Sequence, residues 1–115
     1  MSVEPAKVNF SIWKGATFLK RLTLYTDETR TAVRDLSGST AYLDIKDKPD
    51  GTVLLSLTTG NGGITLSDQG TIDLKITDED TNLITWKTGV YDLIITDELG
   101  DSDAIIYGAF KVRGI

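Results

Sequence analysis

Apolar and polar residues alternate along most of the chain, with the two-residue period of β-strands that bury one face. Clusters of Gly, Pro, Asp, Asn and Ser separate the alternating runs and are typical of turns. The pattern predicts strands over residues 7–13, 17–26, 40–46, 52–59, 71–77, 89–96 and 104–112, with a short extended piece at 64–66. The residues expected to lie buried between two sheets are Leu43, Ile45, Leu74, Ile76, Leu93 and Ile95.

Two segments depart from simple alternation. Lys20 lies on the apolar face of the run 17–26, which indicates an edge strand or a bulge. Residues 78–84 are expected to form one short helical turn, because Thr77 can cap its first turn and the acidic residues that follow suit the helix dipole.

Seven or eight short strands with one helical turn predict an all-β fold. We expect a small β-sandwich with immunoglobulin-like or Greek-key connections, and a small barrel is the alternative. The 115 residues have the length of one domain, so 1–115 is interpreted as a single sandwich domain with residues 1–7 as a candidate N-terminal arm.

Composition removes several classes of function. The chain has no Cys and no His, so disulfides, thiolate metal sites and the commonest general base are absent. Its net charge of -5 disfavours binding to nucleic acid. No apolar run approaches the ~20 residues of a membrane helix, and the first residues do not have the pattern of a signal peptide. We therefore expect a chain made in the cytoplasm that binds neither nucleic acid nor membrane.

Acidic residues are the remaining candidates for chemistry. A hairpin loop at 97–103 could hold Ca²⁺, but it lacks the ligand spacing of an EF-hand, and the acids at 78–80 suit a helix start. Asp44 and Asp73 could be named as a carboxylate pair for glycoside cleavage, although nothing in the sequence singles them out. We expect no enzymatic activity, no metal and no cofactor. The acids of the loop are Asp97, Glu98, Asp101 and Asp103.

A series of short motifs occurs in a fixed order along the chain, at residues 12–18, 35–41, 44–46 with 49–51, 70–74, 77–83, 89–93 and 108–112. Taken in this order, they resemble small phage structural proteins related to the N-terminal domain of the siphophage upper baseplate protein. Together they span about residues 8 to 113. Ala16 stands where the family usually has an acidic residue, so any role of that acid is lost here. The resemblance implies a β-sandwich virion component of a baseplate, tail or neck, with no catalytic residues.

The leading hypothesis is a non-enzymatic bacteriophage virion structural protein that acts as an assembly or adaptor module. Its partners would be other virion proteins, and it would be present as a symmetric homo-oligomer or in many copies. The alternative is an immunoglobulin-like adhesion or carbohydrate-binding module, which should group exposed aromatic residues on one face or carry a calcium loop.

The apolar residues near both ends of the chain are the expected interface, because terminal segments normally fray unless something covers them. A second interpretation is that residues 8–13 and 104–112 are ordinary strands of the domain. Trp13 and Trp86 lie near strand or turn ends, where an exposed Trp is a typical interface anchor and a buried one belongs to the core. The predicted interface residues are Val3, Val8, Phe10, Trp13 and Ile115.

Overall fold

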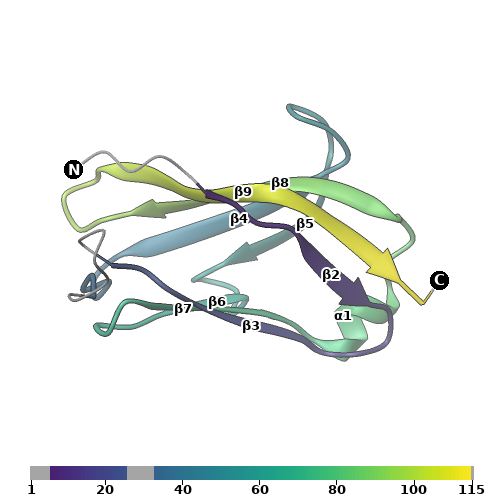
Figure 1. Cartoon of the computed structure of the whole chain (residues 1–115), viewed down its shortest axis with the longest axis horizontal. Helices are drawn as coiled ribbons and strands as arrows, with labels where there is room; N and C mark the ends of the chain where they lie inside the picture. The colour runs from purple at the N-terminus through teal and green to yellow at the C-terminus, as the bar shows by residue number, and fades with distance from the viewer. Residues whose placement is uncertain (1–5, 26–32, 115) are drawn as a thin grey trace.

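The computed structural model describes residues 6–25 and 33–114. Two β-sheets pack face to face as a sandwich, with one short helix at one end of the molecule (Figure 1). The all-β sandwich predicted from the sequence is therefore confirmed. The elements are β1 (Ala6–Lys7), β2 (Phe10–Trp13), β3 (Phe18–Thr23), β4 (Thr40–Lys46), β5 (Val53–Thr58), β6 (Ile64–Leu66), β7 (Thr71–Ile76), α1 (Asp78–Asn82), β8 (Thr88–Thr96) and β9 (Ser102–Arg113).

The larger sheet has six strands in the order β1-β9-β8-β4-β5, and β2 pairs with the later half of β9. The smaller sheet has the order β3-β7-β6. Three hairpins, β4–β5, β6–β7 and β8–β9, each stay within one sheet, whereas the connections β2–β3, β3–β4, β5–β6 and β7–β8 cross between the sheets.

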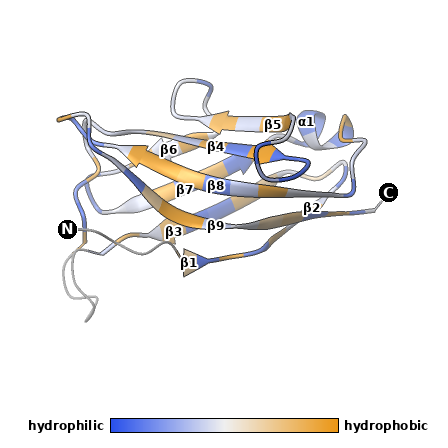
Figure 2. Ribbon diagram, turned by 90° about the horizontal axis from the view of Figure 1, so that it is seen from above, coloured by the Kyte–Doolittle hydropathy of each residue, from blue (hydrophilic) through white to orange (hydrophobic). Residues whose placement is uncertain are grey.

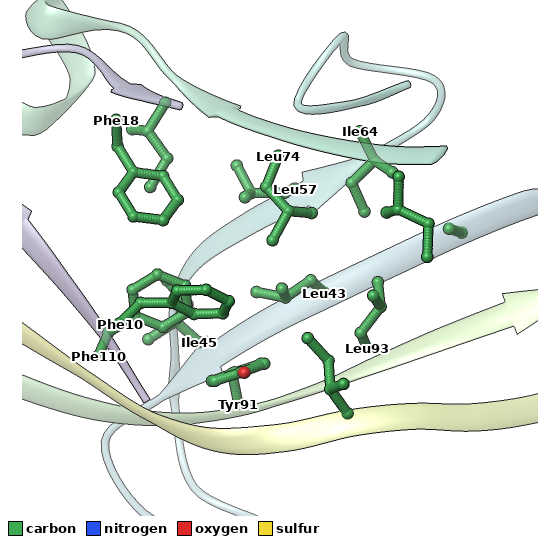
Figure 3. Close-up of a cluster of buried hydrophobic side chains, with 14 of the residues drawn as sticks. Phe10, Phe18, Leu43, Ile45, Leu57, Ile64, Leu74, Tyr91, Leu93 and Phe110 are labelled. Carbon is green, nitrogen blue, oxygen red and sulfur yellow. The ribbon is translucent and has the colours of Figure 1, made fainter. Parts of the chain in front are cut away.

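The core follows from the alternation. In β4 the residues Ala41, Leu43 and Ile45 point inward and are buried, while Tyr42 points outward and is exposed. The six residues predicted to lie between the sheets are all buried, each with at most 1% of its surface exposed. Figure 2 shows apolar and polar residues alternating along the strands, and Figure 3 shows side chains from both sheets meeting in the middle layer.

The sequence left an edge or a bulge open for the second strand, and the edge is correct. Among the described residues, β3 pairs with β7 alone, and Lys20 is exposed on it. The neighbouring Arg21 forms an ion pair with Asp73 of β7 at 2.7 Å, and this contact holds the pKa of the Asp73 carboxyl below its usual range. Thr26, the last residue of the predicted strand, lies outside the described residues.

The first predicted strand is divided into β1 and β2, although both keep the same register against β9. Lys7 lies opposite Tyr107, and Phe10 lies opposite Phe110. Ala6 and Lys7 thus belong to the sheet, so the arm predicted over residues 1–7 is wrong for these two residues.

The break between β1 and β2 arises from contacts of residues 8 and 9 with residues 108 and 109 of β9. The side-chain Oδ1 of Asn9 accepts the N–H of Ala109 at 3.0 Å, where a backbone carbonyl would accept it in a regular ladder. The carbonyl oxygen of Val8 approaches Gly108 so closely that a Cβ at this position would clash with it. Gly108 is therefore required by the close approach of the two strands.

Four aromatic rings close the side of the sandwich that carries β2 and β3. Phe10, Tyr91 and Phe110 come from the larger sheet, and Phe18 comes from the smaller one (Figure 3). Neighbouring ring centroids lie 4.9 to 5.8 Å apart, and every pair has an edge-to-face or tilted arrangement that favours aromatic contact. The hydroxyl of Tyr91 donates to the carbonyl of Val8 at 2.6 Å, and burial raises the pKa of this phenol.

Shortening Leu74 tests the core. Leu74 has no exposed surface, so Leu74→Ala removes buried methyl groups and leaves a cavity. We expect the free energy of unfolding to fall by about 2–5 kcal/mol, measured by urea denaturation. A loss below about 0.5 kcal/mol would mean that the side chain is not enclosed by the two sheets.

Removing the Tyr91 hydroxyl tests the link to Val8. At pH 7, Tyr91→Phe leaves the Val8 carbonyl without this donor and should lower the free energy of unfolding by about 1–2 kcal/mol. Above pH ~10 the unfolded chain loses the phenol proton while the folded protein keeps it, so wild-type stability falls as pH rises. The difference between wild type and variant should therefore shrink between pH 8 and pH 11 in urea titrations. A constant difference would contradict a phenol pKa raised by folding.

Candidate protein interface

The predicted interface residues that the structure describes differ in how far they are exposed. Val3 and Ile115 lie outside the described residues. Phe10 is only 8% exposed and packs in the aromatic cluster, so its prediction as an interface residue is wrong. Val8 is half-buried and packs against the core. Trp13 alone among the described candidates is strongly exposed, at 59% of its surface.

Phe10 is buried by its own chain, which the sequence pattern alone does not reveal. An apolar terminal segment has the same sequence pattern whether its own sheet or a partner covers it. Here the last strand of the chain covers it, because Phe10 and Ile12 lie beside β9 and face the core. The interpretation of residues 8–13 and 104–112 as strands of the domain is therefore correct for Phe10–Trp13 and for the whole later segment.

Trp13 is held outward by the elements around it. It ends β2 with the opposite orientation to buried Ile12, and in the parallel register it lies opposite Arg113 of β9. Immediately after it the chain turns, and the N–H of Ala16 donates to the Trp13 carbonyl at 3.0 Å.

α1 fixes this turn through a buried hydroxyl. Thr77 caps the helix by accepting the N–H of Asp80, as expected from the sequence. Thr81 is fully buried, and its Oγ1 accepts the N–H of Gly15 at 3.1 Å and donates to the carbonyl of Ala16 at 2.9 Å. The position of Trp13 is therefore set by the sheet on one side and by the helix on the other.

Trp13 borders a shallow depression of about 500 Å³ at the end of the larger sheet. Its lining includes Lys87, Lys111 and Arg113, and we call these three residues together with Trp13 the Trp13 patch. Within residues 6–25 and 33–114, no ion pair engages any of the three cations. An exposed indole beside free cations is suited to contact a partner that presents acidic and apolar groups.

A second hollow of about 450 Å³ lies on the other side of Trp13, between the edge strands β2 and β3. Leu19 and Lys20 line it from β3. Trp13 thus borders two open depressions. Trp86, in contrast, is half-buried and packs against the core, so it offers less to a partner.

The structure does not bring the acidic candidates together into one centre. Asp44 lies on the outer side of the larger sheet and Asp73 on the outer side of the smaller one, so the two carboxylates point away from each other. In the hairpin, Asp97 Oδ1 accepts the N–H groups of Leu99 and Asp101, and Asp103 pairs with Arg34. Across the part of the chain that the structure describes, no group of three or more acidic side chains is arranged to hold a metal ion.

Two exposed tyrosines were not among the sequence candidates. Tyr42 and Tyr107 lie on the outer face of the larger sheet, in neighbouring rows of the cross-strand register. Their outward position follows from strand parity, which could have indicated them. Asp92 of β8 lies opposite Tyr107 and also opposite Asp44, so the face combines aromatic and acidic groups.

No protein-family model matches the chain, and no curated protein matches it. Among the described residues, no helix is long and apolar enough to cross a membrane.

Chelation tests the expectation that no metal is needed. Because Asp97 and Asp103 are already engaged within the protein, EDTA should leave the melting temperature unchanged in a thermal scan. A drop of several degrees that added Ca²⁺ reverses would identify the 97–103 loop as a calcium site.

Proposed function

We propose that this chain is a non-enzymatic structural protein of a bacteriophage virion. It acts as an assembly or adaptor module in a baseplate, tail or neck through contacts with other virion proteins. The observation that carries the proposal is the Trp13 patch, an exposed indole beside three cations at one end of the larger sheet. The resemblance to small phage structural proteins over about residues 8 to 113 supplies the virion context.

A few residues carry most of the binding energy of a typical protein interface. Trp and Arg are enriched among the few interface positions that dominate affinity, and Trp13 and Arg113 lie side by side in the register of β2 and β9. Both belong to strands, so a partner would find them already ordered and would lose less conformational entropy on binding.

A carbohydrate-binding or adhesion module is the second candidate. The outer face with Tyr42 and Tyr107 favours it, because exposed aromatic rings are what sugars stack on. The two rings lie on strands separated by β8, and neither borders the depressions at Trp13. Titration with a panel of oligosaccharides, monitored by tyrosine resonances, distinguishes this candidate from the first.

Trp13→Ala tests the assembly function in the phage that encodes the chain. Because Trp13 is exposed, the variant should fold with wild-type stability, whereas its incorporation into particles should fall at least about 10-fold, as for an interface anchor. Quantitative mass spectrometry of purified virions gives the stoichiometry.

The matched control is Leu83→Ala, which removes an apolar side chain that is 76% exposed at the end of α1. Its incorporation should equal that of wild type. Absence of the wild-type chain from purified virions would contradict the proposed function. Normal incorporation of a folded Trp13→Ala variant would mean that the Trp13 patch is not the surface by which the chain joins the virion.

A further inference from the structure

The two ends of β9 carry opposite charge. β9 spans twelve residues and runs along the long axis of a molecule that measures 40 × 26 × 25 Å. It begins at the β8–β9 hairpin and ends at Arg113 in the Trp13 patch, so the two features lie at opposite ends of the sandwich (Figure 1).

The hairpin end is acidic and has an apolar tip. Leu99 is 88% exposed, and Glu98 and Asp101 are exposed beside it. The side chain of Asp97 accepts the N–H groups of Leu99 and Asp101 at 2.9 and 3.0 Å, and the backbone N–H of Asp97 donates to the Asp101 carbonyl at 2.9 Å. The turn therefore holds Leu99 outward in a fixed conformation with carboxylates around it.

The Trp13 patch offers the complement of this hairpin. It joins an exposed indole to Lys87, Lys111 and Arg113, and its depression of about 500 Å³ is open to solvent. An occupant must bring an apolar group for the indole and carboxylates for the cations. The hairpin of this chain has both, although the protein as a whole carries a net charge of -5, which opposes indiscriminate self-association.

We propose that the occupant is the β8–β9 hairpin of a second copy of this chain. Leu99 of one copy packs against Trp13 of the next, while Glu98 and Asp101 pair with Lys87, Lys111 and Arg113. The contact joins two different surfaces, so it is heterologous, and each copy keeps one free surface for the next. It rests on the proposed function only in treating the Trp13 patch as a protein interface.

A charge-swap experiment tests the contact in the full chain. One variant, Lys111→Glu with Arg113→Glu, makes the patch acidic, and the other, Glu98→Lys with Asp101→Lys, makes the hairpin basic. Asp97 stays unchanged because its side chain holds the turn. Circular dichroism first establishes that both variants are folded.

Sedimentation velocity over roughly 10 µM to 1 mM, the range of weak contacts, should show wild type associating at low salt. Each variant alone should be monomeric, since its patch and hairpin have like charge. An equimolar mixture should associate again, because each variant's patch then meets a hairpin of opposite charge. Salt at about 1 M, where the Debye length is about 3 Å, should weaken the wild-type association.

Leu99→Ser tests the apolar part and should weaken association at least about 10-fold, as for loss of an anchor. Leu83→Ser is the matched control and should leave association unchanged, because Leu83 is similarly exposed but belongs to neither surface. The proposal is overturned if the wild-type chain is monomeric at about 1 mM. It is also overturned if either charge-swap variant associates alone as strongly as wild type, or if the equimolar mixture of the two variants stays monomeric.

The particle assay separates this proposal from the proposed function. Loss of Trp13→Ala from virions together with a monomeric wild-type chain would mean that the patch binds a different virion protein. Association that follows the charge-swap pattern in a chain absent from virions would keep the self-contact and overturn the virion function.

Discussion

The packing of Phe18 against Phe10 and Phe110 is the contact on which the rest of the arrangement depends. Consecutive strands β2 and β3 belong to different sheets, and this contact draws together the edges on which they lie, with ring centroids 5.8 and 5.6 Å apart. With Phe10 inward, strand parity requires Trp13 to point outward. The exposed indole is thus a consequence of how the core closes.

The alternation of apolar and polar residues predicted much of the fold. The bounds of β4 coincide with the prediction, since its inward residues alternate without exception, and the Thr77 cap follows from the helix-start pattern alone. The break at Asn9 was not predictable, because it depends on Gly108, about a hundred residues away in the chain. Phe10 shows the same limit, since alternation fixes which way a side chain points but not whether its own chain or a partner meets it.

The candidate interface was predictable only in part for a related reason. Lys111 and Arg113 lie in β9, and the pairing of β2 with β9 brings them to Trp13. Lys87 joins them because the hairpin of β8 and β9 places it beside Val112, whose N–H donates to the Lys87 carbonyl. A net charge of -5 describes the average and conceals the separation of a basic patch from an acidic hairpin. Average charge predicts repulsion from nucleic acid, whereas the arrangement of charges determines which protein surfaces can meet.

The strand β9 connects the Trp13 patch to the β8–β9 hairpin without interruption, so the two surfaces have a fixed position relative to each other. Arg113 lies in the last paired row of β2 and β9, and the Asp97 side chain holds the hairpin at the start of β9, so the backbone of both surfaces is already ordered before binding. A copy bound at one end is therefore held in a fixed direction relative to the other end. Repetition of a heterologous contact between such rigid units gives a closed ring when the rotation per copy divides a full turn, and an open fibre when it does not. The angle between docked copies, rather than the strength of the contact, would then decide the symmetry of the assembly.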